Sequence, residues 1–248
     1  MFKKLFIIAL ILSINIYAQT IKIAVSANVS YAINDLIEEF NRLNPDIKVQ
    51  VTLGGSGKLV AQIRHNAPYQ IFMSADMSYP QALYKDKIAI NQPKIYAEGA
   101  LAYFSIKARD FSKGMDILNN KNIRKIAVAN PKTAPYGRAT KEALINAKLY
   151  DKLKSKFVYG ESISQTVSYA TRATDIGFIA KSSLFSPYMK KYKKGVNWED
   201  VEPKLYKGIN QGIVILKNGK DSKEIEKFYD FILSDKAKEI FKRFGYRV

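Results

Sequence analysis

A glycine-rich segment at residues 54–58, with the sequence GGSGK, holds the residues of this chain best suited to bind an anion. It lies between a strand-like run at 47–51 and a helix-like run at 59–63. Glycines let the backbone turn tightly and approach a ligand, and Ser56 is a residue type that caps helices. The first turn of a helix presents unpaired N–H groups and a partial positive charge, which attract anions. A single junction of this kind is nevertheless more often an ordinary capped helix.

The same segment has the outline of a nucleotide-binding P-loop but lacks two of its required residues. The P-loop pattern needs a glycine at the position held by Thr52 and a Ser or Thr at the position held by Leu59. No hydroxyl is therefore placed to reach magnesium, and we exclude nucleotide hydrolysis at this junction.

Three further segments join the end of a predicted strand to the start of a predicted helix. They are residues 26–30 (SANVS), 134–137 (APYG) and 160–163 (GESI). Ligands of open α/β sheets bind at such junctions. If the two halves of the chain face each other, four helix N-termini converge on one cleft, each with roughly half a positive charge.

The groups offered at these junctions are neutral hydrogen-bond donors. They are the Asn28 amide, the Ser56 and Ser162 hydroxyls, the Tyr136 phenol, and the backbone N–H groups of Ser56, Tyr136 and Ile163. Such donors suit a fully deprotonated dianion, which only accepts hydrogen bonds. Hydrogen phosphate carries a proton that needs a buried acceptor, and Glu161 is the only carboxylate at the four junctions. Phosphate is therefore disfavoured but stays open.

The elements that position these junctions alternate between strand and helix. Strand patterns fall at 21–25, 47–51, 71–73, 100–106, 124–129, 157–159, 176–180 and 212–216, and helix patterns at 29–40, 58–65, 79–87, 138–147, 161–172, 222–234 and 235–244. This rhythm predicts an α/β fold with mostly parallel sheets flanked by helices. We expect one lobe at residues 20–98 plus 210–248 and a second lobe at 99–209.

Composition excludes several functional classes. The chain has no cysteine, so disulfides, thiolate metal sites and cysteine nucleophiles are absent. His65 is the only histidine, so neither a histidine metal site nor a Ser-His-Asp triad can form. We expect no catalytic residue and no cofactor, and a secreted phosphate-ester hydrolase is kept as the enzymatic alternative.

The net charge of +18 points to anionic partners or to simple solubility. The basic residues are spread along the chain without a stripe of interleaved aromatic residues that would follow a nucleic-acid strand. We therefore expect no nucleic-acid partner. Electrostatic steering of a small anion is the functional interpretation of the charge.

The first 18 residues have the pattern of a secretory signal peptide. Lys3 and Lys4 precede a short apolar run at 5–12, and the segment ends at Ala18. The apolar run is too short for a convincing membrane span. We expect cleavage near Ala18 and a mature protein in a bacterial periplasm.

A larger ordered set of motifs covers nearly all of the expected mature chain. It comprises AN at 27–28, GSGK at 55–58, AQI at 61–63, NAPY at 66–69, FMSAD at 72–76, NPK at 130–132, APYG at 134–137, ESI at 161–163, IGFIA at 176–180 and IFKRFGY at 240–246. In this order the motifs resemble the periplasmic molybdate-binding proteins of bacterial ABC importers. The resemblance implies a type II periplasmic binding protein, with two α/β lobes joined by a hinge.

The resemblance also implies which residues bind the ligand. Asn28 and Ser56 would hold the oxyanion from the first lobe, and Ile163 and the backbone N–H of Tyr136 from the second. Molybdenum would be bound only as molybdate, or tungsten as tungstate, through these same residues. The expected protein is a monomer that is not an enzyme and that delivers its anion to an inner-membrane permease. A receptor for sulfate or phosphate is the alternative within this class.

Two departures from the family pattern concern the site. Ala27 stands where one branch often has threonine, which removes a hydroxyl donor, and Ser26 is the candidate to replace it. Ala180 and Lys181 stand where another branch has a ligating tyrosine. Two further candidates, Gly57 and Ser162, belong to the junctions already described.

Overall fold

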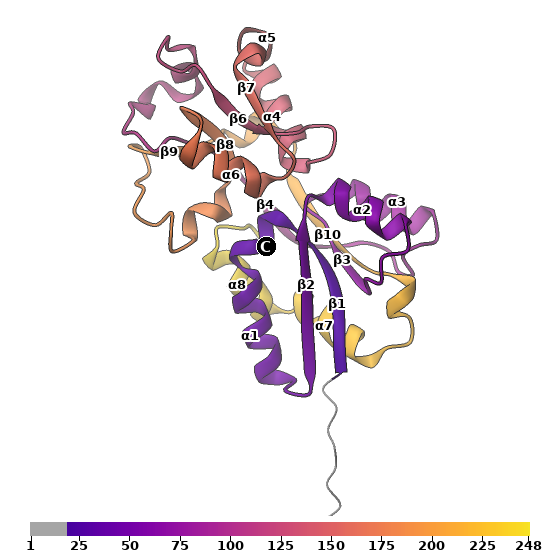
Figure 1. Cartoon of the computed structure of the whole chain (residues 1–248). Helices are drawn as coiled ribbons and strands as arrows, with labels where there is room; N and C mark the ends of the chain where they lie inside the picture. Colours follow the sequence, from indigo (N-terminus) through magenta and orange to yellow (C-terminus); the bar gives the residue numbers. More distant parts are fainter. Residues whose placement is uncertain (1–18) are drawn as a thin grey trace, which may run out of the picture.

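The computed structural model describes residues 19–248, and the predicted signal peptide at 1–18 lies outside the described residues. The described chain forms two lobes, each built on one five-stranded sheet with flanking helices (Figure 1). This confirms the predicted two-lobe α/β architecture. Among residues 19–248, no helix combines the length and the apolar character needed to cross a membrane.

The first sheet has the strand order β2-β1-β3-β10-β4. Its strands are β1 (Gln19–Ser26), β2 (Ile47–Gly54), β3 (Ile71–Met73), β4 (Lys94–Gly99) and β10 (Ile209–Ile215). Strands β1, β2 and β3 pair in parallel, whereas β10 runs antiparallel to both β3 and β4. The sheet is therefore mixed, because β10 returns from the second lobe in the opposite direction.

The helices of the first lobe are amphipathic and bury their apolar faces against this sheet. They are α1 (Ile33–Leu43), α2 (Ser56–Arg64), α3 (Ser78–Lys85), α7 (Lys223–Leu233) and α8 (Asp235–Arg243). On α1, for example, Phe40 is fully buried and meets Phe228 of α7 edge-on, with ring centroids 5.0 Å apart. The helix predicted at 29–40 is divided: a 3₁₀ turn, η1 (Ala27–Tyr31), precedes α1.

The second sheet has the strand order β7-β6-β8-β5-β9 and is also mixed. Its strands are β5 (Leu101–Phe104), β6 (Ile126–Ala129), β7 (Phe157–Gly160), β8 (Ile176–Ala180) and β9 (Trp198–Asp200), and its helices are α4 (Pro135–Asn146), α5 (Tyr150–Leu153) and α6 (Ile163–Arg172). Strand β6 pairs in parallel with β7 and β8, and β5 runs antiparallel to β8 and β9. Strand β9 is not among the strand patterns identified in the sequence.

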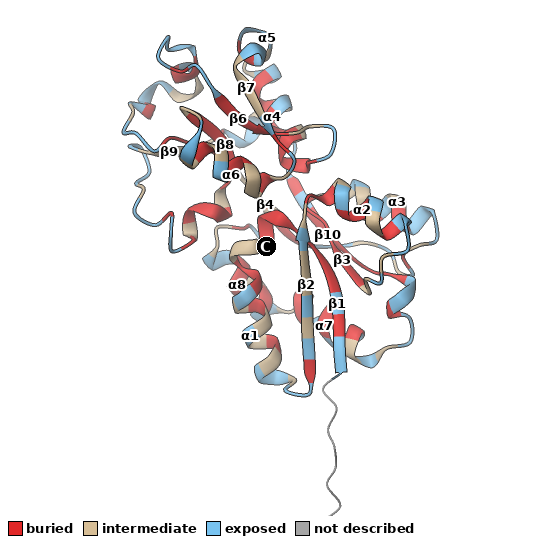
Figure 2. Ribbon diagram, viewed as in Figure 1, coloured by how far each residue is buried: buried red, intermediate tan, exposed pale blue. Residues whose placement is uncertain are grey.

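The chain passes between the two sheets twice, after β4 and before β10. All strands of the first sheet fall within 19–99 and 209–215, and all strands of the second within 101–200. The lobe boundaries themselves stay a prediction. Buried residues form the central strands of both lobes, and the buried colour continues where the lobes meet (Figure 2).

Candidate anion-binding site

A small cavity of about 10 Å³ lies between the two lobes. It is lined by Ser26, Ala27, Asn28, Gly55, Ser56, Ala75, Ala134, Pro135, Tyr136 and Ile163. All of these residues except Ala75 come from the four predicted junctions. None of them carries a charge at neutral pH, and Asn28, Ser56, Tyr136 and Ile163 are all buried. The structure therefore brings the four main predicted residues, together with Ser26 and Ala27, around one enclosed space.

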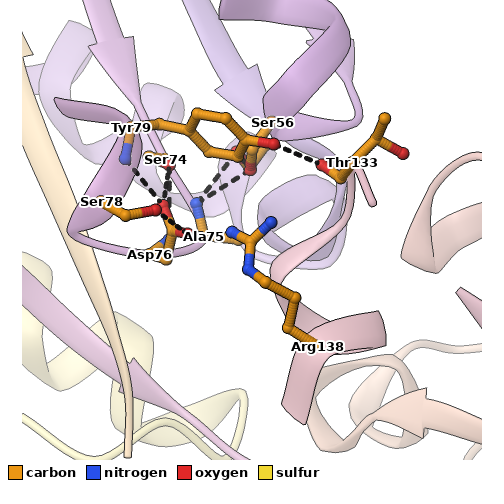
Figure 3. Close-up of polar contacts among 9 residues, drawn as sticks. Ser56, Ser74, Ala75, Asp76, Ser78, Tyr79, Thr133 and Arg138 are labelled. Carbon is orange, nitrogen blue, oxygen red and sulfur yellow. Dashed lines mark hydrogen bonds and ion pairs between the residues drawn. The ribbon is translucent and has the colours of Figure 1, made fainter. Parts of the chain in front are cut away.

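Two serine hydroxyls and one backbone N–H form the first-lobe side of the cavity. Ser26 Oγ lies 2.6 Å from Ser56 Oγ, and Ala75 N donates to both oxygens at 3.0 and 3.2 Å. Figure 3 shows the Ala75 nitrogen beside Ser56. The two hydroxyls carry two protons, and their mutual hydrogen bond uses one. One O–H is left to donate to a ligand.

Among the residues that line the cavity, Ala75 is the one that lies outside the four predicted junctions. It is the second residue after β3, and β3 lies beside β1 in the sheet. Parallel strands end at the same edge of a sheet, so the residues after β3 reach the residues after β1 and β2. The position of β3 next to β1 was the signal that could have identified Ala75.

Helix α4 contributes its first turn from the second lobe. Pro135 occupies the first helical position and has no N–H, so the N–H of Tyr136 is the first that the helix can offer. The N–H groups of Gly137 and Arg138 instead donate to Ala134 O. The Tyr136 phenol, expected as a donor to the ligand, lies 3.3 Å from Gln211 Nε2 and belongs to a separate hydrogen-bond network. Burial raises the pKa of Tyr136 well above its usual value, so the phenol stays protonated.

Helix α6 contributes Ile163, whose N–H belongs to the unpaired first turn. Ser162, an additional candidate, has a different role: its Oγ accepts a hydrogen bond from Gln165 N at 3.2 Å. Gln165 Oε1 in turn accepts from the backbone N–H of Glu161, the residue before the cap, at 2.6 Å. Ser162 therefore caps the helix and does not line the cavity.

Asn28 is fully buried, and its amide nitrogen is already engaged. Asn28 Nδ2 donates to Gln211 Oε1 at 2.8 Å and to the Tyr246 hydroxyl at 3.1 Å. The Tyr246 hydroxyl and Ser182 Oγ donate to the Asn28 carbonyl oxygen at 2.8 and 3.1 Å. Asn28 Oδ1 is one of two buried side-chain atoms in residues 19–248 that have no hydrogen-bond partner. In this arrangement Asn28 does not present the free amide N–H groups expected from the sequence.

Polar contacts hold the lobes together beside the cavity (Figure 3). Gly57 N and the Tyr79 hydroxyl both donate to Thr133 O at 3.1 Å. Arg138 of α4 forms an ion pair with Asp76 and lies over the Tyr79 ring, 5.1 Å from its centroid. The N–H of Gly57, an additional candidate, is thus used between the lobes, and Gly57 does not line the cavity.

The remaining candidates lie outside the cavity. Lys58 is exposed and lines a larger groove of about 780 Å³ between the lobes. Lys181 forms an ion pair with Asp200 at 2.8 Å, and neither it nor Ala180 lines the cavity. His65 is exposed at the end of α2. Within residues 19–248, no cluster of three or more histidine, aspartate or glutamate residues could hold a metal ion.

Comparison with known proteins places this geometry in a family. Residues 21–247 match the family of bacterial extracellular solute-binding proteins. The molybdate-binding protein ModA of Azotobacter vinelandii is 32% identical over 231 residues, covering 92% of this chain and 90% of that protein. The ModA of Rhodobacter capsulatus is 34% identical over 201 residues, covering 80% and 77%.

The solved structure of the Azotobacter vinelandii periplasmic molybdate-binding protein superposes with a TM-score of 0.85 at 29% identity. The match covers 92% of this chain and 99% of that structure. With the family match spanning almost every described residue, the chain belongs to the bacterial extracellular solute-binding proteins.

Proposed function

We propose that this protein is a periplasmic receptor that binds molybdate, and also tungstate, in the cavity between its lobes and delivers it to a membrane ABC permease. One observation carries the proposal: neutral donors from both lobes converge on a single buried cavity. The Ser26–Ser56 pair faces it from one lobe, and the first turns of α4 and α6 face it from the other. The similarity to proteins named for molybdate binding supports the choice of anion.

The character of the donors favours a fully deprotonated oxyanion. No carboxylate lines the cavity, and Glu161, the only one at the four junctions, is exposed. Hydrogen phosphate would bring a proton for which no carboxylate acceptor is present. Helix first turns and hydroxyls stabilise a dianion without a full counter-charge. Sulfate shares the deprotonated state of molybdate, so discrimination against sulfate depends on the size that the cavity reaches when it widens from about 10 Å³ to admit an anion.

Binding by closure explains how a neutral site holds a dianion. The lobes close like a hinge, which removes water and strengthens each hydrogen bond to the anion. The protein would first be exported and its signal peptide cleaved near Ala18. After it binds the anion, the closed monomer would dock on the permease. The family and the relatives are named for binding solutes and molybdate, which supports a role in binding without catalysis.

A thermal-shift panel with molybdate, tungstate, sulfate, phosphate and ferric citrate tests the proposal. A ligand at a hundredfold its dissociation constant adds about 2.7 kcal/mol to the free energy of unfolding. We expect molybdate and tungstate to raise the melting temperature most. The proposal is wrong if neither anion raises it. Turnover of a chromogenic phosphate ester would favour the hydrolase alternative instead.

A further inference from the structure

We propose that Gln211 is a positioning residue that turns the Asn28 amide so that its nitrogen faces the bound oxyanion. Gln211 lies on β10, next to the crossing between the lobes, and is fully buried. It does not line the cavity. The inference rests on the proposed oxyanion-binding function and concerns how the site selects its anion.

The first observation is the unpaired oxygen of Asn28. The two hydrogens of Asn28 Nδ2 are donated to Gln211 Oε1 and to the Tyr246 hydroxyl, and neither residue lines the cavity. The amide atom left for the cavity is Oδ1, which is buried and has no partner. A carbonyl oxygen there would repel an oxyanion. A buried acceptor without a donor also costs free energy.

The second observation is independent and concerns Tyr96. Its hydroxyl lies 2.8 Å from Gln211 Oε1 and 3.1 Å from Ser74 O. Both are acceptors, and a phenol has one proton to give. Burial raises the pKa of Tyr96 well above its usual value, so the phenol stays protonated. Its single proton cannot form a full hydrogen bond to both oxygens.

Turning both amides by half a rotation removes both conflicts. The turn exchanges the oxygen and nitrogen positions of each amide and leaves the other atoms in place. Gln211 Nε2 then donates to Asn28 Oδ1 and to the Tyr96 hydroxyl, whose own proton is free for Ser74 O. Gln211 Oε1 accepts the proton of the Tyr136 phenol. Asn28 Nδ2 now faces the cavity with two N–H groups.

One contact is weakened by the turn. The Tyr246 hydroxyl must share its proton between the Asn28 carbonyl oxygen, at 2.8 Å, and the turned Asn28 Oδ1. Shared protons of this kind are common in proteins. Three gains offset this loss. The Asn28 oxygen acquires a donor, the Tyr96 hydroxyl donates to a single acceptor, and the Tyr136 proton acquires an acceptor. An anion in the cavity would add two hydrogen bonds from Asn28 and favour the turned state further.

The orientation of this amide bears on anion selectivity and on closure. With nitrogen toward the cavity, Asn28 suits a fully deprotonated oxyanion such as molybdate. With oxygen toward the cavity, it offers an acceptor for the proton of hydrogen phosphate. Gln211 also contacts Tyr136 of the second lobe, so lobe closure and the Asn28 orientation are linked through one residue.

A double-mutant cycle with molybdate, measured by isothermal titration calorimetry, tests this role. Gln211→Met keeps the side-chain length but removes the amide, and it should weaken binding at least tenfold. In the Asn28→Ala background the same change should weaken binding less than twofold, because Gln211 acts through Asn28. An equal loss in both backgrounds would show a merely structural role and overturn the inference. Gln70→Met is the control, since Gln70 accepts from Lys22 N elsewhere in the same sheet.

A measurement on the unaltered protein covers the case in which Gln211→Met does not fold. In ¹⁵N spectra, the Asn28 side-chain N–H signals, assigned by their loss in Asn28→Ala, should shift and exchange more slowly when molybdate is added. Molybdate binding without any change in these signals would overturn this inference alone. A protein that binds neither molybdate nor tungstate would overturn the proposed function as well.

Discussion

Ser26 and Ser56 share one backbone donor, and this arrangement fixes where their remaining proton goes. The Ala75 N–H occupies an acceptor position on each oxygen, and the two oxygens share one proton between them. Because both side chains are buried, water does not compete for the second proton. At the scale of single residues, we therefore expect this serine pair to offer one O–H to the anion.

Substitution of Ser56 by alanine removes that donor and leaves Ser26 without its partner. We expect Ser56→Ala to weaken molybdate binding by roughly 1–3 kcal/mol, which is about 5- to 150-fold. Titration calorimetry measures the change, with Ser168→Ala on the exposed face of α6 as the control. Equal affinity of the Ser56→Ala and unaltered proteins would mean that the site lies elsewhere.

Binding should not depend on pH between 6 and 9. Of the residues that line the cavity, only Tyr136 can titrate, and burial raises its pKa well above its usual value. A raised pKa keeps the phenol neutral across this range, so the site gains no charge as pH rises. Molybdate affinity measured at pH 6, 7.5 and 9 should agree within about twofold. A tenfold loss by pH 9 would contradict the assignment.

At the scale of elements, the lobes are linked beside the cavity by contacts of the first turns of α2 and α3 with α4 and with the loop before α4. Gly57 and Thr133 meet directly, while Asp76, Tyr79 and Arg138 form an ion pair and a cation–π contact beside them (Figure 3). Each contact either joins residues of different lobes or positions a residue that makes such a contact. They act on affinity through the fraction of protein that is closed, because the apparent dissociation constant rises as that fraction falls.

Loss of the Arg138 side-chain charge should open the lobes more often. The Arg138–Asp76 pair is partly exposed, so we expect it to contribute less than about 1 kcal/mol. Arg138→Met should weaken molybdate binding about two- to fivefold, measured by calorimetry. Arg42→Met is a matched control, because Arg42 pairs with Glu39 within α1. If both variants bind like the unaltered protein, the ion pair does not bias closure.

A methyl group at position 57 should block closure more strongly. A Cβ on Gly57 would lie 2.8 Å from the Tyr79 hydroxyl and 2.9 Å from Thr133 O, both closer than real contacts allow. We expect Gly57→Ala to weaken molybdate binding at least tenfold and to keep a larger radius of gyration in X-ray scattering with molybdate present. Gly208→Ala is the control, since its Cβ would meet only Glu98 at 3.4 Å or more. A compact, tightly binding Gly57→Ala protein would contradict this.

The sequence predicted the elements that carry local signals and missed those that depend on distant pairing. The strand-to-helix junctions around Asn28, Ser56, Tyr136 and Ile163 follow from short patterns of glycine, serine and proline next to apolar runs. Strand β9 and the antiparallel direction of β10 depend on partners far along the chain. The contacts of Asn28 with Gln211 and Tyr246 span 183 and 218 residues, and no local pattern marks them.

At the scale of the whole molecule, a basic protein encloses a neutral site. The net charge of +18 attracts anions over a distance, whereas we expect the cavity to hold its ligand by hydroxyls and helix first turns. On this account, long-range charge governs the rate at which anions associate, and the short-range donors govern which anion is bound. Closure of the two lobes joins these roles, because it shields the captured anion from water.

Titration calorimetry of molybdate into the protein expressed without residues 1–18 tests the central claim most directly. We expect one molybdate per chain, with affinity far above that for sulfate or phosphate in parallel titrations. Tungstate added first should abolish the molybdate signal, because both anions occupy the same cavity. No binding of molybdate, or equal binding of sulfate and phosphate, would contradict the account.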